Sequence, residues 1–245
     1  MKKCMFPCLI LSLSTLLAGC SSMEMIKSNM DSRSYSMSYV MDSIAPITKK
    51  ISSVAIGSVS FDPTKMGDKT QIMKEKRFLF PLGIINVWEY HDQCIQGRSM
   101  FKDDLPSFLR TSLAREINHS GLVTVDTNKQ SEYSIALSID KIDSEGLYKR
   151  SGISLFVFTS RSEIAGPAVS TLTVSYTLKK GDQVVRRNTF SSSKTTEWIN
   201  RKYIDNATMQ RDYAASMVKA TAYNFKNASG LIVADLNDYF GKQPR

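Results

Sequence analysis

The sequence predicts an α+β domain, in which a mixed or antiparallel sheet is covered by two main helices. Alternating apolar and polar residues mark several strands in the middle of the chain. Apolar residues at spacings of three and four mark one helix early in the domain and another at its end. Strands grouped between two helices are typical of α+β proteins, whereas a regular alternation of strand and helix would indicate a parallel sheet.

The N-terminus has the three parts of an export signal. Lys2 and Lys3 supply positive charge, an apolar stretch follows from about Met5, and small residues precede Cys20. The apolar stretch is shorter than the roughly 20 residues that a membrane-spanning helix needs. Residues 17–20, Leu-Ala-Gly-Cys, resemble the bacterial lipobox, which implies cleavage before Cys20 and acylation of that cysteine.

The resemblance to lipoproteins divides the chain into three parts. Residues 1–19 would be the signal peptide, and residues 20–50, rich in Ser and Met, would be a lipidated flexible tether spanning on the order of 30 Å. Residues 51–245 would form a single periplasmic domain. Because an aspartate after the acylated cysteine marks inner-membrane retention in enterobacterial lipoproteins, Ser21 implies that the anchor lies in the outer membrane.

Cysteine usage limits how the domain is stabilised. Cys4 and Cys8 would leave with the signal peptide, and Cys20 would carry acyl chains, so Cys94 would remain alone. No intramolecular disulfide is then available, and the domain must rely on a packed core.

The first part of the domain is predicted to open with a buried strand over residues 51–61, which ends at the breaker pair Asp62-Pro63. Residues 78–88 are apolar, but Pro81 and Gly83 argue against one continuous central strand. This pattern favours a loop with an apolar tip, followed by a strand from Ile84 to Tyr90.

The clearest helix is predicted from about Asp104 to His119. Asp104 is the expected N-cap and Pro106 suits the first turn. Gly121 is expected to adopt the left-handed conformation that ends many helices.

The rest of the sheet is predicted from short alternating segments. Strands are expected at residues 122–125 and 133–140. Residues 154–159 are apolar on both faces, and residues 170–179 and 183–193 alternate on either side of turn residues, as in an antiparallel hairpin. The last element is a helix from about Asp205 to Phe240, with Asp205 as N-cap and with Gly230 expected to bend or divide it.

The lipobox and this order of elements resemble a group of periplasmic lipoproteins whose domain is similar to the N-terminal domain of TolB. The group includes auxiliary lipoproteins of ABC-type lipid transporters. The resemblance is carried by the opening strand at residues 53–60, the helix at 104–121 leading into the strand at 122–125, the strand at 133–140 and the closing helix. It implies a TolB N-terminal-like fold. Segments 78–88 and 150–167 are longer than a minimal version of that domain needs.

Neither a metal site nor a catalytic site is expected, and no cofactor is implied. The densest group of potential ligands contains Glu89, His91, Asp92 and Cys94, but on a strand the first two would face one side and the last two the other. A nucleophilic enzyme would need an imidazole base, which only His91 or His119 could supply, and no Gly-x-Ser-x-Gly motif is present. The sequence therefore favours a protein that is not an enzyme.

The apolar stretches at residues 78–88 and 155–158 are the main candidates for a binding surface. If they are exposed, they suit a protein partner or insertion into the membrane beside the anchor. The alternative is that both stretches are core strands, and the sequence leaves this open. The partner-binding residues proposed on the first stretch are Phe78, Phe80, Leu82, Ile84 and Trp88.

The charge is basic, with a formal value of +9 that falls to +7 (9 − 2) once Lys2 and Lys3 are removed. Nucleic acid is not an expected partner in the periplasm. Anionic lipid headgroups or cell-wall polymers would be attracted, although the dispersed charges also fit a solvated surface.

These observations predict a lipid-anchored periplasmic binding or assembly module of an envelope transport or secretion complex, which acts by confinement at the membrane. The alternative is a lipoprotein that binds or processes cell-wall polymer, for which Asp103 with Asp104, or Asp140 with Asp143, are the adjacent carboxylates. A third hypothesis is a homo-oligomer that works by forming a ring.

Overall fold

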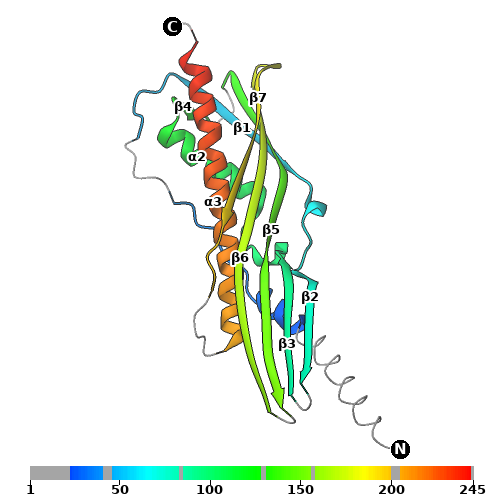
Figure 1. The fold of residues 1–245 in the computed structure, drawn as a ribbon. Coiled ribbons are helices and arrows are strands. Elements are labelled where there is room, and N and C mark those ends of the chain that lie inside the picture. The colour runs from blue at the N-terminus through cyan, green and yellow to red at the C-terminus, as the bar shows by residue number, and fades with distance from the viewer. Residues whose placement is uncertain are drawn as a thin grey trace, which may run out of the picture.

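A computed structural model of the chain describes residues 23–40, 46–82, 85–127, 131–155, 158–199 and 205–243. Within these residues, seven strands form one mixed sheet with helices against one face (Figure 1), so the predicted α+β class is confirmed. The strands are β1 (Ser52–Phe61), β2 (Gln71–Leu82), β3 (Ile85–Ile95), β4 (Val123–Val125), β5 (Tyr133–Leu155), β6 (Phe158–Lys180) and β7 (Gln183–Thr195). The helices are α2 (Leu105–Ser120), α3 (Asn206–Gly241), a helical segment at residues 23–30, and the short 3-10 turns Pro63–Lys65 and Arg98–Met100.

Strand β5 is the centre of the sheet and has different neighbours along its length. It pairs with β6 throughout. On its other edge, the first half of β5 lies parallel to β1, and the second half, from Glu145 to Leu155, lies antiparallel to β3. Strand β4 continues the sheet beyond β1, and β2 continues it beyond β3. The four strands β2, β3, β5 and β6 therefore make up one end of the sheet.

Strands β5 and β6 are much longer than the segments predicted from alternation. The predicted strands at residues 133–140 and 170–179 lie inside them, and the turn at Gly181, with φ of 55°, is confirmed. Residues 154–159 do not form one strand, because residues 154–155 end β5 and residues 158–159 begin β6. Their apolar character on both faces comes from a hairpin end, where both strands contribute apolar residues.

Helix α2 begins as predicted, since the Asp104 carboxylate accepts a hydrogen bond from the Ser107 backbone N–H at 3.0 Å. The expected left-handed Gly121 is wrong, because its φ is −82°. The Lys50 ammonium donates to the carbonyl oxygens of Asn118 at 2.9 Å and Gly121 at 2.6 Å, so these carbonyls have a partner without a left-handed turn. The positive charge also lies at the negative end of the helix dipole.

Helix α3 begins at the predicted N-cap, where the Asp205 carboxylate accepts from the Thr208 backbone N–H at 2.6 Å. Gly230 does not divide the helix, which runs without interruption to Gly241. Buried residues lie on both sides of Gly230, for example Phe225 and Leu236. Their packing in the core stabilises the helix and offsets the low helix propensity of the glycine. None of the helices in the described residues is both long enough and apolar enough to span a membrane.

The segment before the sheet differs from the expected flexible tether over residues 20–50. Ile26, Met30 and Met37 are buried in the core, and the Asn29 side chain donates to that of Gln210 on α3 at 2.8 Å. Apolar residues at positions 23, 26 and 30 have helical spacing. The Ser- and Met-rich composition of the segment pointed instead to a flexible tether. The predicted signal peptide, Cys20 and residues 41–45 lie outside the described residues.

Candidate functional site

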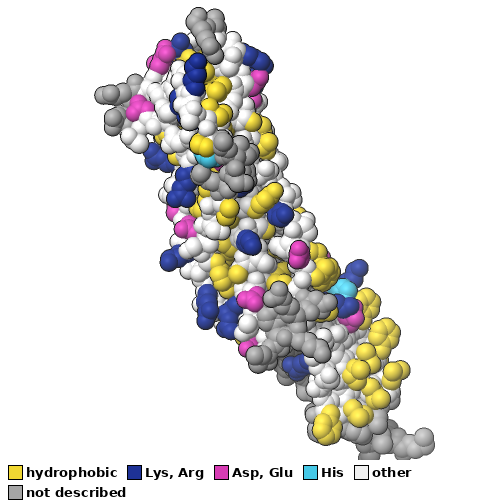
Figure 2. Space-filling model, turned by 90° about the vertical axis from the view of Figure 1, so that its left-hand side faces the viewer, with side chains coloured by type: hydrophobic (Ala, Val, Ile, Leu, Met, Phe, Trp, Pro, Cys, Tyr) yellow, Lys and Arg dark blue, Asp and Glu magenta, His cyan; other side chains and the backbone are white. Residues whose placement is uncertain are grey.

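The candidate site is the end of the sheet formed by two adjacent hairpins, β2–β3 and β5–β6. Their ends extend beyond the first turn of α3 (Figure 1). Hydrophobic side chains gather on the surface at this end of the molecule, with charged side chains bordering them (Figure 2). We call this surface the apolar end. Its large exposed hydrophobic residues are Phe78, Leu79, Phe80, Leu82, Ile153, Leu155 and Phe158.

Strand register places most of these side chains in rows across the four strands. Phe80 lies opposite Val87, which lies opposite Ile153 on β5. One row further toward the hairpin ends, Leu82, Ile85, Leu155 and Phe158 are paired in the same way. Directly opposite residues of antiparallel strands point to the same face, so these rows form one continuous apolar surface.

This surface faces away from the helices. The Tyr148 hydroxyl accepts a hydrogen bond from Gln210 of α3 at 2.8 Å, so Tyr148 points toward α3. Side chains alternate along β5, and Ser151, Ile153 and Leu155 therefore point to the opposite face. The apolar end is thus not covered by α3.

Further along β6 the same outer face is mostly polar, with Val169 as an exposed apolar exception. On β6 it carries Thr171, Thr173, Ser175 and Thr177, while Leu172, Val174, Tyr176 and Leu178 are buried on the helix side. The exposed fractions of Phe80, Leu82 and Phe158 are 59%, 64% and 75%. Because moving such a side chain out of water is worth about 1.5–3 kcal/mol when complete, this concentration at one end favours a binding surface.

Trp88 lies on the helix side of the sheet rather than in these rows. An added Cβ at Gly152 would lie 2.4 Å from Trp88 Cζ2, so the indole packs directly over the glycine. The Trp88 and Tyr90 rings lie 5.1 Å apart. Trp88 therefore adds an aromatic layer behind the apolar rows.

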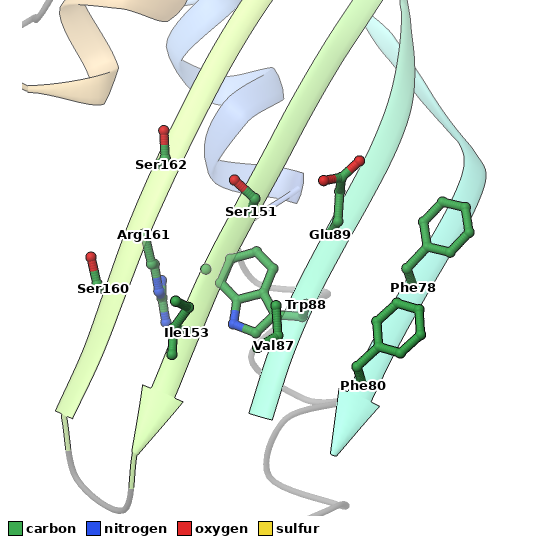
Figure 3. A pocket seen from close by; sticks show the side chains of 11 residues that line it. Phe78, Phe80, Val87, Trp88, Glu89, Ser151, Ile153, Ser160, Arg161 and Ser162 are labelled. Atoms are coloured by element: carbon green, nitrogen blue, oxygen red, sulfur yellow. The ribbon is translucent and has the colours of Figure 1, made fainter. Parts of the chain in front are cut away.

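A shallow groove of about 550 Å³ crosses the apolar end (Figure 3). Phe78 and Phe80 lie along one side of it on β2, and Ser160 and Ser162 lie on β6 at the other side. Val87, Glu89, Ser151 and Ile153 lie between them on β3 and β5. Because the walls are mostly apolar and open to solvent, the groove suits an apolar occupant better than a small polar substrate.

A small group of charges borders the groove. The Glu89 carboxylate accepts from the Lys149 ammonium at 2.9 Å and lies 2.6 Å from His91 Nε2. The hydrogen bond from Lys149, followed by the contact with His91, holds the pKa of Glu89 below its usual value. The His91 ring also makes an edge contact with Phe78, with 6.0 Å between the ring centroids. Glu89 is thus kept as a paired carboxylate at the border.

The structure brings together most of the sequence-predicted site residues. Phe78, Phe80 and Leu82 are exposed on β2, which is an edge strand and not the predicted loop. An edge strand tolerates Pro81, because its outer side needs no ladder partner. Ile84 lies outside the described residues, and Trp88 is half-buried on the other face.

The sequence does not predict that the second hairpin completes the same surface, and residues 155–158 are expected there as a separate stretch. Ile85 and Val87 lie within the predicted stretch but not among its named binding residues, and Ile153 lies outside both stretches. The available signal was the absence of charge from both residues 78–88 and residues 151–160. Which strands are neighbours depends on long-range pairing, and local pattern does not contain it.

The predicted separation of Glu89 and His91 from Asp92 and Cys94 is found. Glu89 and His91 are in contact on the outer face, while Asp92 and Cys94 are buried. Burial raises the pKa of the Cys94 thiol to about 12, so it is not an activated nucleophile. In the part of the chain that the structure describes, no group of three or more His, Cys, Asp or Glu side chains could hold a metal ion.

No protein-family model matches the chain, and no curated protein matches it in sequence. Among solved structures, it is similar to a Xanthomonas campestris protein of family DUF330, with a TM-score of 0.44 and 12% identity over 86% of this chain and 100% of that chain. It is also similar to a candidate lipoprotein from Caulobacter crescentus, with a TM-score of 0.33 and 15% identity over 56% of this chain and 84% of that one. Likenesses of this size leave the function to be argued from the residues of the chain itself.

Proposed function

We propose that this chain is a lipid-anchored binding module of the bacterial cell envelope, which acts without a catalytic step. The lipobox at residues 17–20 supports acylation of Cys20, and Ser21 supports an outer-membrane anchor with the domain in the periplasm. The observation that carries the proposal is the apolar end, where two adjacent hairpins leave large side chains uncovered.

The mechanism is confinement. An anchored domain explores a small volume, so its effective concentration toward another membrane component is far higher than in free solution. The resemblance to TolB N-terminal-like lipoproteins supports a transport or secretion complex as the setting, with an envelope protein as partner.

The carboxylates that suggested a cell-wall enzyme have structural partners. Asp104 caps α2, and Asp103 accepts a hydrogen bond from the Met37 backbone N–H at 2.6 Å. Asp140 accepts from the Ser138 hydroxyl at 2.7 Å, and Asp143 pairs with the Lys141 ammonium at 2.9 Å. These partners make the cell-wall alternative the weaker proposal.

The anchor is tested by Cys20→Ala in cells. The expected product is an uncleaved precursor that takes up no labelled fatty acid, because the acylated thiol and the cleavage site are lost together. Ser21→Ala is the matched control and should be processed and labelled normally. Labelling of the Cys20→Ala protein would overturn the anchor.

The binding surface is tested by photocrosslinking from an unnatural amino acid at Leu82. Val184 on β7 is the control position. It is exposed beside the β6–β7 turn, at the other end of β6 from the apolar end. Defined adducts from position 82, with an envelope protein or with membrane lipid, that do not form from position 184 are the expected result. Equal adducts from both positions, or adducts with cell-wall fragments alone, would count against the proposal.

A further inference from the structure

We propose that the apolar end enters the interfacial layer of the bilayer that holds the acyl chains of Cys20, so that the domain rests on the membrane at two points. The inference builds on the proposed anchor and names the occupant of the apolar end as a lipid surface. Three features of the chain carry it: the place where the N-terminal segment ends, the order of side chains along the hairpins, and the charges at the border.

The N-terminal segment ends at the hairpins. Met23 is buried, and its Sδ lies 3.9 Å from Nη2 of Arg77, which is on β2. Met23 is the third residue after Cys20, and a chain extends by at most about 3.6 Å per residue, so the chain between them can reach no further than about 11 Å. Acyl chains attached there would hold the bilayer at the end of the molecule that carries the apolar rows.

The side chains along both hairpins change in the order that a membrane interface favours. Residues 78–88 and residues 151–160 contain no charged side chain. The row nearest the hairpin ends is fully apolar, and Trp88 and Tyr90 form an aromatic layer behind it. Trp and Tyr are enriched where hydrocarbon meets headgroups. The first charged residues lie level with this layer: Arg161 is opposite Gly152, which is opposite Trp88, and Arg150 is opposite Tyr90.

The border charges suit an anionic headgroup layer. Lys74, Lys76 and Arg161 are exposed there, with Glu75 among them, and the carboxylate of Glu89 is paired with Lys149. Basic side chains close to a membrane are attracted to anionic lipid. A bilayer therefore meets both the apolar rows and the basic border.

The strand edges limit the depth of insertion. In the described residues, two strand edges at this end pair with no other strand. One is the outer edge of β2, and the other is the edge of β6 from Phe158 up to the bridge between Ala165 and Ile199. Unpaired backbone N–H and C=O groups are not tolerated in hydrocarbon, so the backbone must stay in the hydrated headgroup layer. Side chains such as Leu82 and Phe158 can still reach the acyl boundary, a depth on the order of 5–10 Å.

The test uses the two tryptophans of the chain, Trp88 and Trp198. The full acylated lipoprotein carrying Trp198→Phe is reconstituted into vesicles of phosphatidylethanolamine and phosphatidylglycerol, with or without bromine on the upper acyl carbons. We expect bromine to reduce Trp88 emission at least twofold, because the indole lies in the layer next to the side chains that reach the acyl boundary. The matched Trp88→Phe protein, in which Trp198 alone emits, should lose little emission.

A charged variant gives the decisive comparison. In the Trp198→Phe background, Phe80→Asp combined with Phe158→Asp should abolish the bromine effect, while the acyl chains keep the protein on the vesicles and thermal unfolding stays unchanged. Unquenched Trp88 in protein that floats with the vesicles would overturn the inference and leave the anchor intact. Quenching that persists in the double variant would also overturn it. Mass analysis of the N-terminus reports the anchor separately, and absence of acyl chains would overturn the proposed function instead.

Discussion

Arg150 on β5 donates two hydrogen bonds to the Asp92 carboxylate on β3, from Nε at 3.1 Å and from Nη2 at 2.7 Å, and both side chains are buried. Arg77 on β2 donates to the other carboxylate oxygen. The ring of Tyr90 contacts both guanidinium groups, with Cζ of Arg77 4.5 Å and Cζ of Arg150 5.5 Å from its centroid. The cluster joins three strands directly behind the apolar end, so it holds the first hairpin in place against the second.

We expect Asp92→Leu to lower the free energy of unfolding by about 3–5 kcal/mol, since it leaves the Arg150 guanidinium buried without this carboxylate. Urea unfolding of the variant measures the change. Arg150→Met should cost a similar amount, because it leaves the carboxylate of Asp92 with Arg77 alone. The double variant should recover much of the loss, because it buries two apolar side chains and leaves neither the Arg150 guanidinium without Asp92 nor the Asp92 carboxylate with Arg77 alone. A double variant as unstable as the sum of the single ones would contradict this account.

A second ion pair predicts a pH dependence of stability. The Asp235 carboxylate on α3 accepts from Arg186 of β7 at 2.6 Å and 3.1 Å, and from Asn188 at 2.7 Å. The hydrogen bonds from Arg186, with those from Tyr176 and Asn188, lower the pKa of Asp235 to about 2. A carboxyl with a depressed pKa in the folded state stabilises the fold above its unfolded pKa, and this contribution is lost as the pH falls toward the folded pKa.

The stabilisation from Asp235 should therefore be complete above about pH 5 and disappear between about pH 4 and pH 2. Its size should be on the order of 1–2 kcal/mol, reduced by the partial exposure of Arg186. Asp235→Asn should remove this part of the acid dependence, measured by urea unfolding from pH 2 to pH 7. Asp238→Asn is the control, because Asp238 lies further from Arg186, at 3.4 Å, and is more exposed.

The apolar end predicts substitutions that change binding without changing stability. Phe158→Asp and Leu82→Asp should each shift the free energy of unfolding by less than about 0.5 kcal/mol, because both side chains are mostly in water already. Val174→Asp is the buried comparison on β6 and should unfold the domain, since it puts a charge into the core. Thermal unfolding separates the two classes. A large loss of stability from Phe158→Asp would show that this position belongs to the core.

Local signals were enough to predict the elements with strong chemical markers. Asp104 and Asp205 are predicted as N-caps from their residue type and position, and both carboxylates accept a hydrogen bond from the first turn of their helix. The alternation of residues 170–179 predicts a strand and the face that it buries. The end of α2 was mispredicted at Gly121, because the partner of its carbonyls is Lys50, far away in sequence. A distant side chain that satisfies a helix end leaves no local trace.

The sequence predicts only part of the candidate site, because the rest depends on contacts between distant segments. Residues 78–82 were correctly singled out by their apolar composition, yet they were assigned to a loop because Pro81 disfavours a central strand. An edge position removes that objection, and edge or centre is decided by pairing between distant segments. The joining of the two hairpins into one surface follows from the pairing of β3 with β5, which composition alone does not specify.

The N-terminal segment gives the last prediction, because the structure packs residues that were expected to be a free tether. Met30 is fully buried, whereas Met25 in the same helical segment is 54% exposed. Met30→Ala should lower the free energy of unfolding by about 2–5 kcal/mol if the segment belongs to the core, through lost burial and the cavity left behind.

Met25→Ala is the matched control, since both substitutions remove the same kind of side chain from the same helical segment. Its effect on the free energy of unfolding should be below about 0.5 kcal/mol, because Met25 is exposed. Urea unfolding of the two variants measures the difference directly. Equal, small effects would mean that residues 23–30 do not pack on the domain in solution. In that case the link between Met23 and Arg77 would no longer hold Cys20 near the hairpins, and the membrane contact of the apolar end would have to arise without help from the anchor.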